Sequence, residues 1–297
     1  MFKNYLSIII KNLGKNKIYS LINISGLAIG MAACFFIYQY VRFELSYDKF
    51  NKNIDRLYRV PISYEGSLSS SGSTATNPPA VGPAMKAEIP GVEDFVRLAP
   101  KTVFLKTAGV SYTDSKGNIK RFNEEKFFLA DSSFFTMFTF PFISGDPATV
   151  LAKANSVVIT ESIAKKYFNN ESAINKIIEI NKAPITVTGV IKDIPENSHV
   201  KFDFLVSMNT VGEKFAYTEW GWPEFYNYVL LKKGVDPKSV EAKLPALIDK
   251  YLGKKMAELN SKSNLWLQPV KDIHLHSDLR IELESNGSER TVYFLSI

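Results

Sequence analysis

Two histidines near the end of the chain have the spacing that comes closest to a chemical site. His274 and His276 alternate in "IHLHS", and on a β-strand they would share one face. Two such imidazoles could begin a zinc site, but zinc needs a third ligand, such as His199 or a carboxylate. The neighbouring sequence supplies none. We therefore interpret these histidines as structural or surface residues and predict no metal site.

Motifs for other chemistries are missing from the sequence. It contains no Gly-x-x-x-x-Gly-Lys-Ser/Thr run, so we expect no phosphate loop and no ATP binding. There is no nucleophile elbow, and three histidines leave little for a catalytic triad. The net charge of +6 is spread along the chain instead of forming a basic block, which argues against nucleic acid as a partner. The sequence therefore predicts neither enzymatic activity nor a bound cofactor.

A long uncharged run near the start indicates a membrane anchor. From Ile18 to Val41 no residue is charged, and at about 1.5 Å per residue the run would extend about 36 Å as a helix. That is enough to cross a hydrocarbon core of about 30 Å. We predict a transmembrane helix over residues 18–42. The run is too long for a signal peptide. "MAAC" before Phe35 loosely resembles a lipidation box, but cleavage at Cys34 would leave an apolar start instead of a flexible tether.

Two glycines within this run suggest how the helix could pack. Gly26 and Gly30 form a Gly-x-x-x-Gly in "GLAIG", which lets two membrane helices approach closely. Glycine is also common in membrane helices for other reasons. The sequence leaves two alternatives open. Gly26 and Gly30 either form a contact with a second helix in a dimer, or they have no partner helix.

The flanks of the span suggest an orientation. Residues 1–17 contain lysines and no acid, and apolar residues recur at helical spacing in residues 2–13. We predict an amphipathic helix on the cytoplasmic interface, with the large following domain outside the cell membrane.

The rest of the chain is typical of a mixed α+β domain. With 45% hydrophobic and 22% charged residues it should be globular. Strand-like segments alternate irregularly with three amphipathic helices, so a parallel doubly wound sheet is not expected. The segments expected to be strands are "RLYRVPISY", "DFVRLAPKTVFLKT", "GVSYTDSKGNIKRF", "SVVIT", "KIIEINKAPITVTGVI" and "WLQPVKDIHLHSDL"; those expected to be helices are "PPAVGPAMKAEI", "ESIAKKYF" and "DPKSVEAKLPALIDKYL". Trp220 and Trp222 are interpreted as the cover of a sheet core.

Three stretches together resemble one protein family. Residues 11–60, beginning "KNLGKNKIYSLINISG", look like the first membrane helix and stalk of MacB/FtsX-type ABC transporter permeases. Residues 134–168 and 185–208 resemble the MacB-like periplasmic core domain, and residues 267–279 ("LQPVKDIHLHSDL") resemble its return to the membrane. Asn169 and Asn175 stand where the family often has glycine, and asparagine tolerates the same left-handed turns.

The resemblance implies an architecture. A stalk and periplasmic core domain would occupy residues 43–290, and residues 291–297 ("TVYFLSI") would be the first turns of a second membrane helix, in a truncated permease or gene fragment. We expect residues 56–278 to form two α+β lobes, one of them containing strands near Arg56–Tyr64 together with "SVVIT" and "ITVTGVI". Residues 122–140 and the Trp220 region would fill or bridge the other lobe. Because both domain ends must meet the membrane, Asp48 and Leu283 should lie close together.

The resemblance also implies a role. The chain would be a non-enzymatic permease subunit of the bacterial inner membrane. It would couple ATP hydrolysis on a separate ATP-binding cassette subunit to movement of the periplasmic domain, for export or mechanotransmission. Implied partners are a second permease copy and a periplasmic adaptor or substrate protein. The alternative is a single-span, membrane-anchored sensor that binds a ligand outside the cell, and a pocket lined by convergent polar groups would favour it.

Overall fold

The computed structural model describes residues 5, 15, 17–66 and 72–297. The chain divides into two compact units. One comprises residues 1–46 and 288–297, and the other residues 47–287. The predicted interfacial helix over residues 1–17 lies almost entirely outside the described residues.

The first unit contains two helices. Helix α2 (Lys17–Glu44) has exposed apolar side chains along nearly its whole length, and Glu44 is its one buried residue. Of the helices described, α2 alone is long and apolar enough to cross a membrane, judged by length and composition. Helix α9 (Glu289–Ser296) contacts α2. The hydroxyl of Ser288 caps α9 by accepting a hydrogen bond from the Thr291 N–H. Residues 291–297 are thus largely helical, as expected, and their place in a membrane stays a prediction.

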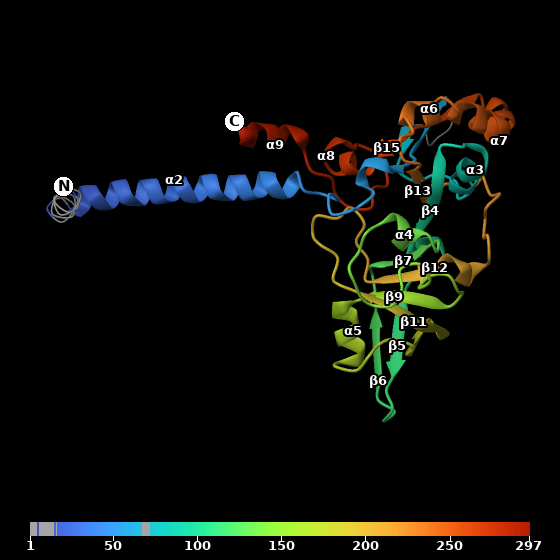
Figure 1. Cartoon of the computed structure of the whole chain (residues 1–297), viewed down its shortest axis with the longest axis horizontal. Coiled ribbons are helices and arrows are strands. Elements are labelled where there is room, and N and C mark those ends of the chain that lie inside the picture. Colours follow the sequence, from blue (N-terminus) through green and yellow to red (C-terminus); the bar gives the residue numbers. More distant parts are fainter. Residues whose placement is uncertain (1–4, 6–14, 16, 67–71) are drawn as a thin grey trace. The chain divides into compact units, whose positions relative to one another are not determined.

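The second unit is built on one large mixed sheet (Figure 1). From one edge to the other, its strands are β15 (Gln268–Pro269), β1 (Leu57–Arg59), β13 (Tyr226–Leu231), β4 (Val92–Pro100), β7 (Phe127–Ala130), β12 (Phe204–Ser207), β9 (Ser156–Thr160), β11 (Ala183–Ile191), β10 (Ile177–Ile180), β5 (Gly109–Thr113) and β6 (Ile119–Asn123), with β8 (Phe142–Ser144) beside β11. A small separate sheet has the order β14 (Ser261–Leu265), β2 (Ile62–Gly66) and β3 (Gly72–Thr74). The mixed α+β class is confirmed.

Helices cover different parts of this unit. Helices α3 (Val81–Glu88), α6 (Pro237–Glu241) and α7 (Leu244–Glu258) share one hydrophobic core with β4 and β13. Helix α5 (Glu161–Phe168) buries Ile163 and Tyr167 in a second core with β9–β11. A third core contains the phenylalanines around α4 (Phe134–Met137). Figure 1 shows the α3/α7 lobe and the α5 lobe as two parts of one unit, joined by the sheet.

The expected grouping of strands was wrong in one respect. We placed the Arg56–Tyr64 segment in one lobe with "SVVIT" and "ITVTGVI". In the structure β1 is separated from β9 by four strands, because its hydrogen-bonding partners are β13 and β15. The remainder of that segment, β2, pairs in the small sheet with β14 and β3. Strand β7, within the Phe122–Phe140 region, is the bridge between lobes, pairing with β4 and β12.

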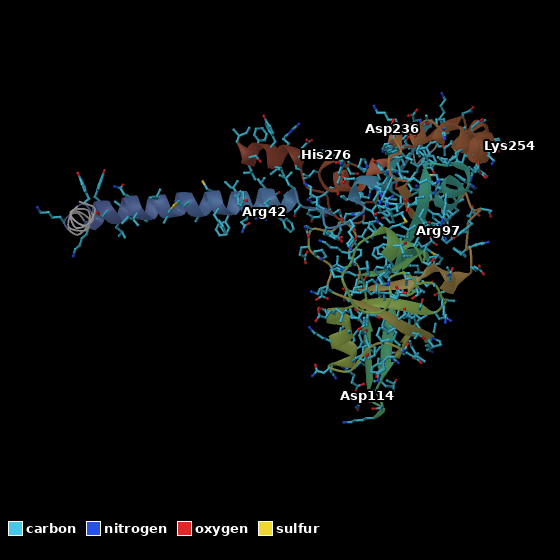
Figure 2. The ribbon with its side chains drawn as sticks, viewed as in Figure 1. Arg42, Arg97, Asp114, Asp236, Lys254 and His276 are labelled. Atoms are coloured by element: carbon cyan, nitrogen blue, oxygen red, sulfur yellow. The ribbon has the colours of Figure 1, made fainter. Side chains whose placement is uncertain are left out.

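Two other expectations need correction. The segment "WLQPVKDIHLHSDL" is mostly not a strand: β15 is two residues long, and α8 (Ile273–His276) follows. The single helix expected over "DPKSVEAKLPALIDKYL" is two helices. Asp236, labelled in Figure 2, caps α6 by accepting the Lys238 N–H, and α7 restarts with Pro245 in its first turn. Proline has no N–H to continue the earlier helix but is well tolerated in a first turn.

Candidate functional site

The candidate site is the place where the two ends of the second unit meet, which we call the junction. Its entering segment is Tyr47–Arg59 and its leaving segment is Ile273–Gly287. Tyr47 and His274 stack with their ring centroids 3.3 Å apart, and Tyr47 and Leu283 line the same small cavity. This agrees with the expectation that the chain near Asp48 and the chain near Leu283 lie close together.

Asp48 fastens the entering segment to the sheet. It is 1% exposed and has a positive φ of 58°, a conformation that costs a non-glycine residue energy. Its carboxylate lies 2.8 Å from Nδ1 of His199 and also accepts the His199 backbone N–H. Nε2 of His199 lies 3.0 Å from the hydroxyl of Tyr228 on β13. Nδ1 of His199 and Oδ2 of Asp48 are both buried and face each other at 2.8 Å, and among the described residues neither atom has a well-aligned hydrogen bond.

Burial sets the protonation of the tyrosine in this chain. The Tyr228 side chain is fully buried, and desolvation raises the pKa of its hydroxyl well above the ordinary value of 10.0. Tyr228 therefore stays neutral and can donate its proton to His199. Asp48, His199 and Tyr228 thus form a fixed link between residues that directly follow α2 and the central sheet.

The next residues are tied to the loop after α4. Asn51 accepts the Thr139 N–H on its side-chain oxygen, and the Lys52 N–H donates to the Thr139 hydroxyl. Asn53 donates its side-chain amide to the Met137 carbonyl. Because these bonds come from three consecutive residues, the segment has little freedom to swing independently of the phenylalanine core beside α4.

Arg59 joins the leaving segment to β1. The residue is 0% exposed. Its guanidinium forms a bidentate ion pair with Glu282 and also donates to Gln268 and Ser277. Burial acts to raise the pKa of the Glu282 carboxyl. Hydrogen bonds and charge from Arg59, with help from Ser277, outweigh that effect and hold the pKa below its ordinary value. The pair is therefore ionised and fully partnered, as a buried pair must be to persist.

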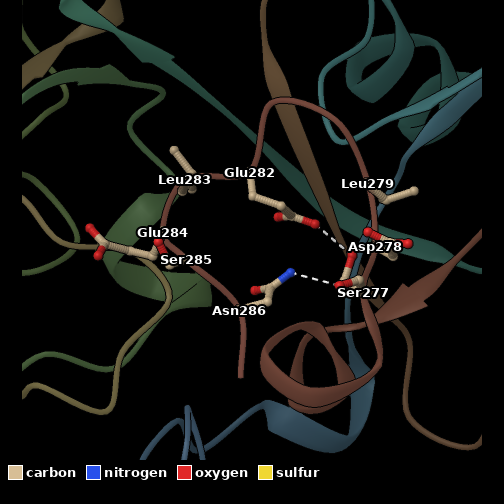
Figure 3. Close-up of a pocket in the computed structure, with 8 residues that line it drawn as sticks. All are labelled: Ser277, Asp278, Leu279, Glu282, Leu283, Glu284, Ser285 and Asn286. Atoms are coloured by element: carbon tan, nitrogen blue, oxygen red, sulfur yellow. Dashed lines mark hydrogen bonds between the residues drawn. The ribbon is translucent and has the colours of Figure 1, made fainter. Parts of the chain in front are cut away.

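The leaving segment also encloses an open hollow of about 550 Å³, shown in Figure 3. Glu282, Ser277 and Asn286 project into it. Ser277 donates to Glu282, and the Asn286 amide donates to the Ser277 carbonyl. Because these three polar groups bond one another and Arg59, they hold the leaving segment in shape.

The three histidines considered as metal ligands do not form one cluster in the structure. His274 and His276 lie on the short helix α8, where positions two apart point in different directions, so the expected shared strand face is wrong. His274 is buried against Tyr47 and His276 is exposed. His199 belongs to the Asp48 link. Within the described ranges, no three His, Cys, Asp or Glu residues are grouped to hold a metal ion.

The other predicted positions are also accounted for. Trp220 packs on the α3/α7 core and Trp222 on the α5 core, as expected. A Cβ at Gly26 or Gly30 would meet no atom within 4 Å, so helix packing through these glycines stays a prediction. Asn169 and Asn175 both have positive φ, 56° and 63°, but the ψ of −114° at Asn169 lies outside the left-handed helical region.

Sequence reasoning missed Arg59 and its partner Glu282. One signal was present: Arg59 is a charge within the strand-like "RLYRVP", and an arginine inside a buried strand requires a carboxylate partner. Nothing in the sequence indicates that the carboxylate lies more than 200 residues away.

Comparisons with known proteins agree with this architecture. Residues 20–247 match the family model of the MacB-like periplasmic core domain. A domain of a putative permease protein from Porphyromonas gingivalis has a similar fold, with a TM-score of 0.61 and 21% identity over 83% of this chain and 98% of that domain.

Two further solved structures are more distant. The periplasmic region of MacB from Actinobacillus actinomycetemcomitans matches with a TM-score of 0.49 and 17% identity, covering 75% of this chain and 94% of that one. The extracellular domain of the noncanonic ABC-type transporter YknZ from Gram-positive bacteria matches with a TM-score of 0.45 and 15% identity, covering 71% and 99%. No protein of curated function matches the sequence significantly.

The family match spans well over half of the chain and includes most of α2 and the strands of both lobes. Domains of this kind are components of membrane ABC transporters instead of catalytic enzymes. The match and the apolar helix α2 together indicate a membrane anchor with an extracytoplasmic domain. The chain belongs to the family of permeases that carry the MacB-like periplasmic core domain.

Proposed function

We propose that this chain is the permease subunit, or part of one, of a bacterial ABC transporter whose ATP-binding subunit is a separate polypeptide. ATP hydrolysis in the cytoplasm would move α2, and the junction would pass this movement to the extracytoplasmic domain for export or mechanotransmission. The observation that carries this proposal is the double fastening of the junction. Asp48 links the entering segment to β13 through His199 and Tyr228, and Arg59 links β1 to Glu282.

A helix that transmits movement needs a rigid connection to the domain that it moves. A bidentate ion pair with a fully buried guanidinium and a buried chain of polar contacts restrict motion more than exposed contacts do, because these groups are largely shielded from water. The segment after α2 would therefore move together with the sheet instead of bending away from it. Such stiffness is what mechanotransmission requires.

We also propose an orientation and a set of partners. Residues 1–17 would lie in the cytoplasm and the second unit in the periplasm, with α2 in the inner membrane and residues 291–297 beginning a second span. The permease would act as a dimer, with Gly26 and Gly30 as a candidate packing surface, beside a periplasmic adaptor or substrate protein. The chain itself would hold no cofactor and would not hydrolyse ATP.

The sensor alternative has a weaker basis. In the hollow of Figure 3, Ser277, Glu282 and Asn286 are already hydrogen-bonded to one another, and Ser277 and Glu282 also bond Arg59. A ligand bound through these three groups would have to break those bonds and could not replace all of them. Each buried polar group left without a partner would weaken binding.

Purification of the tagged full chain from its native membrane in mild detergent tests the proposal. We expect an ATP-binding cassette ATPase to co-purify in stoichiometric amount, and the chain stripped of it to show no ATP hydrolysis. A Lys116→Cys label in a Cys34→Ala background should react with an impermeant thiol reagent from outside. Recovery of the chain without any such ATPase, or protection of position 116, would contradict the proposal.

A further inference from the structure

Strand β6 ends the large sheet and exposes one backbone edge. In an antiparallel pair, successive residues alternately direct their N–H and C=O groups toward and away from the partner strand. Asp114 N–H donates to Asn118 and Glu124 N–H donates to Ala108, which fixes the alternation. Ile119, Arg121 and Asn123 therefore direct their backbone groups away from β5. Over residues 17–66 and 72–297 no partner for these groups is seen.

The side chains at this edge are unusually apolar for exposed positions. Ile119 is 62% exposed and Phe122 is 42% exposed. Ile119 lies opposite Thr113 on β5. Phe122 packs edge-on against Tyr167 of α5, so it is held in a fixed position while still reaching solvent. An edge strand with accessible apolar side chains is a template for pairing with another strand.

The same edge is positively charged. The hairpin from Gly109 to Asn123 contains Lys116, Lys120 and Arg121, against a single acid, Asp114. Asp114, labelled in Figure 2 at the hairpin tip, is occupied within the turn: it accepts hydrogen bonds from the Lys116 and Asn118 backbones and from the Asn118 side chain. These bonds, the Asn118 side chain first, lower the pKa of Asp114. The Asp114 carboxylate stays ionised in the turn, three residue pairs away from the Ser111–Arg121 pair, and so it does not lie opposite Arg121.

This charge disfavours a second copy of the chain as occupant. The one antiparallel register that pairs the full length of β6 with itself centres on Arg121, and it places two arginines directly opposite each other. Like charges at directly opposed positions destabilise a strand pair. An extended segment with acidic side chains would instead face Arg121 with opposite charge, whereas the Lys120 ammonium already donates to the Lys166 carbonyl and the Asn169 side chain. The charge of the β6 edge therefore favours an acidic partner strand, in addition to the backbone hydrogen bonds that any strand could form.

We propose that β6 is a docking edge for an extended, acidic segment of another protein, which adds to the sheet as a further strand. Because alternate side chains of a strand share one face, apolar side chains of that segment would cover Phe122 on one face, and acidic side chains would lie beside Ile119 and Arg121 on the other. Backbone hydrogen bonds to Ile119, Arg121 and Asn123 would provide affinity that depends little on sequence, and the charges would provide selection. This proposal is independent of the transport role.

The test uses the full chain in nanodiscs and a fluorescein-labelled peptide, acetyl-Thr-Glu-Val-Glu-Val-Thr-amide, with anisotropy as the readout. A matched peptide with lysine in place of glutamate is the charge control. We expect saturable binding of the acidic peptide and slower hydrogen exchange at the Arg121 and Asn123 amides. Arg121→Glu should weaken binding about fivefold to tenfold, because it replaces an attraction by a repulsion.

Two further variants separate backbone pairing from general charge attraction. Asn123→Pro removes one outward N–H without changing the charge, and proline is tolerated at the edge of a sheet. It should weaken binding about threefold to tenfold, the effect of one hydrogen bond. Lys254→Glu on α7, in the other lobe, should leave affinity unchanged (Figure 2). Thermal unfolding checks that each variant is folded, and Ile119→Pro replaces Asn123→Pro if it is not.

Several results would overturn the proposal. These are absence of saturable binding, equal binding of the lysine peptide, or an affinity that neither proline variant changes. Concentration-dependent self-association that Asn123→Pro abolishes would show instead that the edge is occupied by a second copy of the chain.

Discussion

At the scale of single residues, the junction depends on ionised groups that have left water. Removing one partner of a buried ion pair leaves the other charge desolvated and alone, which costs far more than losing an exposed pair. Arg59 has no exposed surface, and its partner side chain Glu282 is 13% exposed. Arg56 forms a comparable pair with Glu93 at the surface, where the two side chains are 22% and 44% exposed. The more exposed Arg56–Glu93 pair therefore serves as a control for the buried Arg59–Glu282 pair.

Arg59→Met should lower the free energy of unfolding by about 3–5 kcal/mol, because Glu282 would remain buried without its cation. Arg56→Met should cost at most about 1 kcal/mol. Urea unfolding of both variants, followed by tryptophan fluorescence, measures the difference. Equal losses would show that Arg59 and Glu282 are not a buried pair in solution.

The Arg59–Glu282 pair also predicts a pH dependence. The folded-state pKa of Glu282 lies below its ordinary value of 4.5. Its contribution to stability is therefore complete above about pH 4.5 and is lost as the pH falls through the folded-state pKa. Glu282→Gln should be less stable than the natural protein at pH 6, and the gap should narrow toward pH 3. A gap that stays constant over that range would mean that the carboxyl is not held ionised by Arg59.

At the scale of elements, local patterns predicted what local forces determine. Strand β9 followed by α5 was expected from alternating and helical spacing, and both are present with Ile163 and Tyr167 inward. Strands β5 and β6, and strands β10 and β11, lie in two segments that were expected to be strands, and each of these segments folds into a hairpin. The strands that pair with β1 in the sheet were not predicted correctly. The pairing of β1 with β13 joins residues far apart in sequence, and no local pattern specifies which distant strand fits.

The junction could be predicted only in part, for the same reason. That the two ends of the domain meet followed from the need to return to the membrane. The contacts that hold them together, Asp48 with His199 and Arg59 with Glu282, depend on side chains brought together by the finished fold.

The β10–β11 turn gives a prediction at this scale. Asn181 and Lys182 both have positive φ, 49° and 73°, which is typical of a two-residue type I′ turn. Lysine pays a steric cost in that conformation and glycine does not. Lys182→Gly should therefore stabilise the domain by about 0.5–1 kcal/mol, whereas Lys182→Ala, which retains a Cβ, should not. The urea midpoints of the two variants decide this; a gain from alanine equal to that from glycine would refute the turn assignment.

At the scale of the whole molecule, the chain combines one apolar helix with an extracytoplasmic domain whose two ends are fastened to the same sheet. Family membership places it in an ABC transporter context. We propose that movement begun in the cytoplasm is carried through the junction. Its two buried links are suited to that task because they couple the entering and leaving segments to β13 and β1.

The most direct test is a distance measurement on the complex of the chain with its ATPase. A single spin label at Lys254→Cys in α7, in a Cys34→Ala background, would be measured by electron–electron double resonance between the two chains of the proposed dimer in nanodiscs. Because the junction couples the sheet to α2, we predict that the distance between the two labels shifts between the nucleotide-free and ATP-bound states. Identical distributions in the two states, while the complex hydrolyses ATP, would contradict this coupling.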